Sequence, residues 1–283
     1  MNRLLGTLKN LFVENPMLCE VGRFQRRYLS LRSPVNMAGL AIIGVLSALF
    51  LLEAYTAVRN PFDIMLQELA LLTFFVPMLG FRAIAGEREK RTWDILLVAP
   101  ITKSQIVVGK FLAAVFGIIV VMALGHIPVL ITIVNSQQPY FGYMEAYPRR
   151  FETTNIPAAD AICLSFSLFA YALTLFFSAR VKRSLTALGA AYGVLILLLL
   201  TFGAAESLFG GFAFLNPFVS LGYLGNQRYV EYPYLTGGWQ CSFIYTALTI
   251  LLVTWTCRTL TFAENEVRFL PKLKKHARTQ ESQ

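Results

Sequence analysis

The sequence predicts an all-α integral membrane protein with six transmembrane helices. Hydrophobic residues make up 56% of its 283 residues and charged residues only 14%, whereas soluble domains carry about 25% charged residues. Six apolar segments have the ~20 residues that a helix needs to cross ~30 Å of hydrocarbon. Lysine and arginine are concentrated on alternate connections between these segments. A chain so poor in charge requires lipid as the solvent for its apolar surface.

The six predicted spans are long apolar runs without a central charge. They cover approximately residues 37–57, 66–84, 106–134, 158–179, 184–205 and 242–262. Because these runs occupy most of the chain, we expect one membrane domain at 37–262 and no separate soluble domain. It is preceded by a cytoplasmic N-terminus, 1–36, and followed by a basic cytoplasmic tail, 263–283.

The distribution of basic residues predicts the orientation. With the N-terminus in the cytoplasm, the outer segments contain four of the 25 Lys and Arg residues, and the inner segments contain the others. Those four are Arg59, Arg149, Arg150 and Arg228. The positive-inside rule therefore predicts a multi-pass protein of the cell (inner or plasma) membrane with both termini cytoplasmic. The net charge of +9 suits anionic lipid, and no motif indicates nucleic acid as a partner.

Two further segments predict helices that do not span. Residues 14–29 contain Asn15-Pro16 near their start, which favours the start of a helix. The predicted helix has an apolar face and, on the opposite side, a basic face. The apolar residues recur at helical spacing and are Met17, Val21, Phe24 and Tyr28. We expect this amphipathic helix to lie at the inner interface, with an ordinary soluble helix as the alternative. The Gly- and aromatic-rich segment 206–238 predicts short re-entrant or interfacial helices at the outer side.

No motif for catalysis or for a resident metal is present. The sequence lacks GxxxxGK[ST], HExxH and G-x-S-x-G, so we expect no catalytic residues, no metal site and no bound cofactor. The cysteines form no CxxC pair. Cys163 and Cys241 could pair near the outer face, but small apolar residues buried in helices are the favoured interpretation.

Ionisable residues near the membrane are few. His126 lies in the third predicted span, where a packed histidine is favoured over a proton relay or substrate contact, and His276 lies in the basic tail. Four acidic residues lie toward the outer ends of the spans, and they are Glu53, Asp63, Glu68 and Glu206. Their position disfavours a proton-coupled carrier, which needs carboxylates near the bilayer centre.

The connection after the second span contains the most specific motif. Residues 86–110 read GEREKRTWDILLVAPITKSQIVVGK. This segment resembles the signature E-R-E-x-G-T-x-E-x-L-L, proline, G-K of the ABC-2 type permeases. The matching residues are Glu87, Arg88, Glu89, Thr92, Leu96, Leu97, Pro100, Gly109 and Lys110. Arg91 replaces the usual glycine, and Asp94 replaces a common glutamate.

The resemblance implies the permease subunit of an ATP-driven exporter whose cytoplasmic coupling helix docks on separate ABC ATPase subunits. It implies a homodimer or heterodimer of permeases in membrane lipid, with ATP bound by the partner ATPase. The residues expected at the coupling surface are Glu87, Arg88, Glu89, Thr92, Trp93, Leu96, Leu97 and Pro100. The alternatives are a membrane scaffold or assembly factor and a proton-coupled secondary transporter. The sequence does not identify the substrate.

Overall fold

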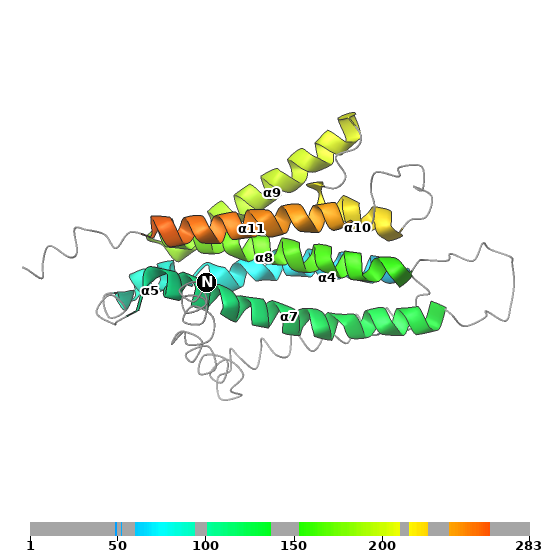
Figure 1. Cartoon of the computed structure of the whole chain (residues 1–283), viewed down its shortest axis with the longest axis horizontal. Coiled ribbons are helices and arrows are strands. Elements are labelled where there is room, and N and C mark those ends of the chain that lie inside the picture. The colour runs from blue at the N-terminus through cyan, green and yellow to red at the C-terminus, as the bar shows by residue number, and fades with distance from the viewer. Residues whose placement is uncertain are drawn as a thin grey trace, which may run out of the picture.

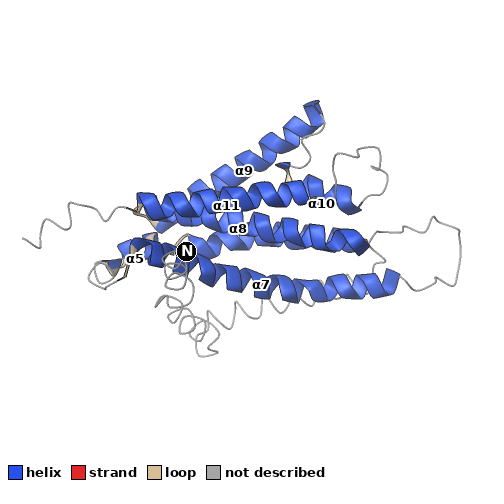
Figure 2. Ribbon diagram, in the orientation of Figure 1, coloured by secondary structure: helices blue, strands red, loops and turns tan. Residues whose placement is uncertain are grey.

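The computed structural model describes residues 60–93, 101–136, 153–209, 215–225 and 238–260, together with Leu49 and Leu52. These residues contain helices and no strand (Figure 2), so the predicted all-α class is confirmed. The elements in chain order are α4 (Pro61–Gly80), α5 (Ala85–Glu89), α7 (Lys103–Ser136), η1 (Thr153–Asn155), α8 (Ile156–Arg180), α9 (Ser184–Phe209), α10 (Pro217–Gly225) and α11 (Trp239–Thr259).

Five stretches of the described chain have the length and composition to cross a membrane. They contain α4, α7, α8, α9 and α11, which correspond to the second to sixth predicted spans. Of the first predicted span, 37–57, only Leu49 and Leu52 are described. The interfacial helix at 14–29 and the tail at 263–283 lie outside the described residues. The first predicted span, and with it the total of six, therefore stays a prediction, as do these flanking segments.

Helix α8 forms the centre of the bundle. It packs against α4, α7, α9 and α11 (Figure 1). Its buried residues follow one another along the helix instead of forming a single stripe, which is typical of a helix enclosed by neighbours. Helix α9 differs, since Leu185, Leu197 and Leu200 on it are exposed. An exposed apolar face of this kind suits lipid or another membrane helix.

Helix α4 begins earlier than predicted because of a local capping signal. Asn60 accepts a hydrogen bond from the Phe62 N–H at 3.1 Å, and Pro61 occupies the first turn, as is favourable at a helix start. The helix ends at Gly80, which packs closely against α8. A Cβ atom at Gly80 would lie 3.1 Å from the Cβ of Thr174. The small residue therefore permits the close approach of α4 and α8.

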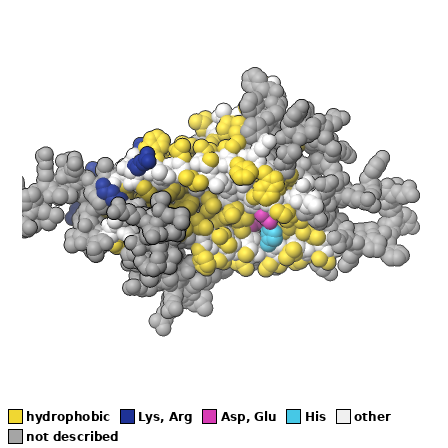
Figure 3. Space-filling model, viewed as in Figure 1, with side chains coloured by type: hydrophobic (Ala, Val, Ile, Leu, Met, Phe, Trp, Pro, Cys, Tyr) yellow, Lys and Arg dark blue, Asp and Glu magenta, His cyan; other side chains and the backbone are white. Residues whose placement is uncertain are grey.

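Basic side chains gather at one end of the bundle, which we call the basic end. It contains α5, the start of α7 and the ends of α8 and α11, and Figure 3 shows dark blue side chains there. The described basic residues at this end are Arg82, Arg88, Lys90, Arg91, Lys103, Lys110, Arg180, Lys182, Arg183 and Arg258. No Lys or Arg of the described ranges lies at the opposite, far end. This distribution is the one that the positive-inside rule gives to a cytoplasmic side.

The segment predicted to hold short outer helices contains α10 at the far end. Its nine residues are too few to cross a bilayer, and Asn216 caps it by accepting from the Phe218 N–H at 3.0 Å. Helix α10 packs against α4 and α8. Whether it enters the outer leaflet stays a prediction. Cys163 and Cys241 are buried free thiols, in agreement with the favoured interpretation of these cysteines.

Candidate functional site

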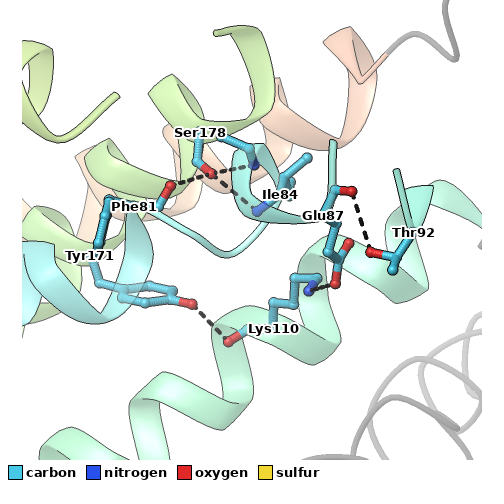
Figure 4. A network of polar contacts seen from close by, with 8 residues as sticks. Phe81, Ile84, Glu87, Thr92, Lys110, Tyr171 and Ser178 are labelled. Atoms are coloured by element: carbon cyan, nitrogen blue, oxygen red, sulfur yellow. Dashed lines mark hydrogen bonds and ion pairs between the residues drawn. The ribbon is translucent and has the colours of Figure 1, made fainter. Parts of the chain in front are cut away.

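The connection between α4 and α7 carries the sequence motif, and its described part runs from residue 81 to residue 93. We call this part the α4–α7 connection. It leaves α4 at Phe81, forms the short helix α5 and reaches Trp93. Polar contacts join it to three other helices of the bundle, and Figure 4 shows those with α7 and α8.

The first contact is made by the buried hydroxyl of Ser178 on α8. It accepts hydrogen bonds from the N–H groups of Ile84 at 3.0 Å and Ala85 at 2.9 Å, and it donates to the Phe81 carbonyl at 3.0 Å (Figure 4). Helix starts leave N–H groups without helical partners. Since Ile84 and Ala85 are fully buried, water cannot supply these partners. Ser178 therefore caps α5 from a neighbouring helix and uses the full capacity of its hydroxyl.

The second contact joins α5 to α7. The Glu87 carboxylate pairs with the Lys110 ammonium at 2.5 Å, and their side chains are 24% and 18% exposed. The Tyr171 hydroxyl of α8 donates to the Lys110 carbonyl at 3.1 Å. The Glu87 carbonyl also accepts from the N–H of Thr92 at 3.0 Å and from its hydroxyl at 3.2 Å (Figure 4). Glu87 thus fixes both the following turn and the start of α7.

The third contact joins α5 to α9. The Glu89 carboxylate accepts from the Ser184 N–H at 2.6 Å and from the Ser184 hydroxyl at 2.8 Å. Ser184 is the first residue of α9. A carboxylate at this position satisfies a free N–H group and lies favourably at the positive end of the helix dipole.

The turn after α5 contains an unusual backbone conformation. Arg91 has a φ of +56°, in the left-handed region that side chains with a Cβ disfavour. This residue occupies the position at which the ABC-2 signature usually has glycine. The glycine of that signature is therefore explained by the turn, and Arg91 adopts the same turn despite its side chain.

A sequence model of the ABC-2 family transporter proteins matches residues 53–229 of the chain. This chain belongs to that family. The match covers more than half of the sequence and extends from before α4 to beyond α10, so it includes the α4–α7 connection. None of the curated proteins compared with the chain matches it. The resemblance seen in residues 86–110 is confirmed, and the permease is a membrane component of a transport system.

Two of the predicted coupling residues, Arg88 and Trp93, contact each other within the permease. Trp93 is only 4% exposed and lies in the hydrophobic core, and its expected role as an apolar anchor for an ATPase stays a prediction. The Arg88 guanidinium lies over its ring, 5.2 Å from the centroid, a cation–π arrangement. Trp93 therefore anchors the connection to its own bundle, with Arg88 packed on it.

The exposed surface of the α4–α7 connection is polar and basic. Glu89, Lys90, Arg91 and Thr92 are exposed, although the Glu89 carboxylate is already hydrogen-bonded to α9. The predicted coupling residues Leu96, Leu97 and Pro100 lie outside the described residues. Of the predicted set, the structure thus brings together Glu87, Arg88, Glu89, Thr92 and Trp93 in one compact segment.

The conformation of Arg91 gives a direct test of this turn. Arg91→Gly is expected to stabilise the permease by up to about 1 kcal/mol, because glycine adopts the left-handed conformation without the Cβ penalty. Thermal unfolding of the detergent-purified protein measures the effect. Lys90→Gly is the matched control, since Lys90 is also exposed but has an ordinary φ of −83°. It should destabilise by about 0.5–1 kcal/mol, and equal effects of the two substitutions would contradict the assignment.

The permease contains a second polar group that the sequence analysis did not assemble. His126 of α7 pairs with Asp160 of α8, with 3.4 Å between Nε2 and Oδ2, and Glu68 of α4 lies close enough to interact electrostatically with both. From the sequence, Glu68 and His126 are not predicted to form one group, and Asp160 is not predicted as a member of it, since it lies inside the predicted span 158–179. An acidic residue within a span was the available signal.

Proposed function

We propose that the chain is the transmembrane permease subunit of an ATP-driven ABC exporter, and that its α4–α7 connection receives the movement of a separate ATPase subunit. Family membership supports the transport role. The sequence has no P-loop motif, so in this proposal ATP is bound and hydrolysed by the partner chain. The main support for the coupling role is that this one connection is joined by polar contacts to α7, α8 and α9.

These contacts suit the transmission of force from the membrane surface into the bundle. Helix α4 continues directly into the connection, Glu87 binds α7, and Glu89 binds the start of α9. The Ser178 hydroxyl holds the same segment on the central helix. A displacement of α5 would therefore act on four helices at once. Packed helices respond to such a displacement by shifting as units between discrete arrangements.

The exposed cations Lys90 and Arg91, rather than the two glutamates of the motif, are proposed as the described part of the ATPase-docking surface. Glu87 and Glu89 are used in contacts within the chain. Lys90 and Arg91 project from the basic end beside Thr92 and suit an acidic surface on the ATPase. Charges at the rim of an interface contribute mainly to orientation and to association rate.

The proposed exporter contains two permeases, identical or different, and two ATPase subunits in the cell membrane, with both permease termini cytoplasmic. In the described part of the bundle, the centre is filled by the buried helix α8, so the proposed path does not run through it. A two-fold interface between permeases would supply one. The exposed apolar residues of α9 and α7 provide faces for lipid and for the second permease.

Reversing the two exposed charges tests the docking surface. Lys90→Glu combined with Arg91→Glu is expected to lower recovery of the ATPase with the tagged permease by roughly tenfold, since like charges across an interface are costly. Co-purification in mild detergent measures the effect. Lys182→Glu is the control, because Lys182 is an exposed cation at the same end but on the α8–α9 connection. An unchanged recovery for the double variant would refute docking through this surface.

A further inference from the structure

In the half of the bundle toward the far end, Glu68 of α4, His126 of α7 and Asp160 of α8 form a group of interacting ionisable side chains. Asp160 and His126 are partly open to the surface, with 34% and 28% of their side chains exposed. Glu68 is deeper and only 7% exposed. Its carboxylate lies against α7 at Gly125, where a Cβ atom would be 2.5 Å from Glu68 Oε1. Gly125 therefore makes room for the carboxylate beside His126.

Hydrogen-bond acceptors outnumber donors in this group. Glu68 Oε1 and Asp160 Oδ1 are buried and have no hydrogen-bond partner. Pro128 lies inside α7 and has no N–H, so the carbonyl of Leu124 lacks its usual helical donor. An unpartnered acceptor costs free energy when it is buried. A ligand that brings N–H or O–H donors would satisfy these acceptors.

A positive charge on the ligand would also be favourable. The group contains two carboxylates and one imidazole, so with both carboxylates ionised it carries one net negative charge even when His126 is protonated. No Lys or Arg of the described residues lies in this half of the bundle beyond the basic end. The described residues also provide no set of three His, Cys, Asp or Glu side chains arranged to hold a metal ion. An organic cation fits these observations.

The surroundings of the group are apolar. At 1.5 Å per residue, Asp160 lies roughly 6 Å from the start of α8 and Glu68 roughly 10 Å from the start of α4. Figure 3 shows a histidine and an acidic side chain next to each other on a surface that is otherwise largely hydrophobic. Exposed apolar residues of α7 continue along this helix, and they are Val121, Leu124, Ile127 and Leu130. A ligand held here would place an apolar tail on the lipid-facing side.

We propose that Glu68, His126 and Asp160 bind the ammonium group of an amphipathic primary amine. The ammonium group supplies one positive charge and N–H donors that can satisfy the two unpartnered carboxylate oxygens. The alkyl chain lies along α7. This proposal names a substrate class for the exporter and relies on the exporter function only for the statement that the amine is transported. Binding itself requires no ATPase.

The test uses n-decylammonium as the probe and the thermal unfolding of the full-length chain in detergent as the readout. The unfolding midpoint is expected to rise saturably with decylammonium. Decyltrimethylammonium, which has the same charge and tail but no N–H donor, should raise it much less. Glu68→Gln and Asp160→Asn should each weaken the response at least tenfold. Asp63→Asn, which neutralises an exposed carboxylate in the first turn of α4, should leave it unchanged.

Equal responses to the two probes, or an undiminished response in Asp160→Asn, would overturn the proposal. If the unfolding midpoint changes with pH but not with decylammonium, the amine proposal is wrong and the group is a protonation site instead. Because Asp160 is partly exposed, its variant remains informative if Glu68→Gln does not fold. If no ATPase co-purifies with the permease while decylammonium still binds, the exporter function is refuted but the amine-binding site is not.

Discussion

Ser178→Ala is expected to destabilise the permease by about 2–6 kcal/mol, since it leaves two buried N–H groups without an acceptor at about 1–3 kcal/mol each. The donors are those of Ile84 and Ala85, both fully buried. The variant should lose thermal stability in detergent and fail to hold α5 against α8. Thermal unfolding measures the first effect, and protease cleavage within the α4–α7 connection measures the second.

Ser167→Ala is the matched control for this prediction. Ser167 is on the same helix and is equally buried, but its hydroxyl donates only to the Cys163 carbonyl of its own helix, at 2.7 Å. Removing it leaves no N–H group unpartnered, so its effect should be about 1 kcal/mol or less. If Ser167→Ala and Ser178→Ala had the same effect, the capping role of Ser178 would be wrong.

The Glu87–Lys110 pair gives the second large effect. Glu87→Gln or Lys110→Met alone is expected to destabilise the permease by about 1–3 kcal/mol, because each leaves a largely buried charge without its partner. Each single variant should also reduce ATP-driven transport in proteoliposomes while the ATPase still co-purifies. The last result separates force transmission through α7 from docking, which the exposed Lys90 and Arg91 are proposed to perform.

The double variant tests whether the two residues act as a pair. Glu87→Gln with Lys110→Met should be less destabilising than the sum of the single variants, since it leaves neither charge unpaired. Lys182→Met, at an exposed cation of the same end, should change neither stability nor transport. Strict additivity of the two single substitutions would mean that the pair contributes nothing to the native structure.

The predicted helices match the described bundle because their apolar runs are long and lipid forces every backbone group into a helix. The third predicted span, 106–134, lies within α7, and the fourth, 158–179, lies within α8. The second, 66–84, was displaced toward the C-terminus. Hydropathy missed the start of α4 because Asp63, Gln67 and Glu68 lower it, whereas the Asn60-Pro61 cap was present in the sequence.

The candidate site was predictable only in its location. The motif predicts that residues 86–110 contain the coupling segment of an ABC-2 permease, and the family match includes these residues. Side-chain direction was not predictable, because the charged run of Glu87 to Arg91 has no apolar periodicity that distinguishes an inner face from an outer one. Partners far along the chain decide this, since Glu87 pairs with Lys110 and Glu89 with Ser184.

The enclosed position of α8 bears on how the protein is made. Helices enter the membrane in chain order, and α11 is the last of the neighbours that cover α8. Until it arrives, the face of α8 around Phe166 and Phe169, which later packs on Tyr245, faces lipid or the insertion machinery. The bundle therefore closes only after α11 has been made. A chain truncated before α11 would expose an unpaired membrane surface to quality-control proteases.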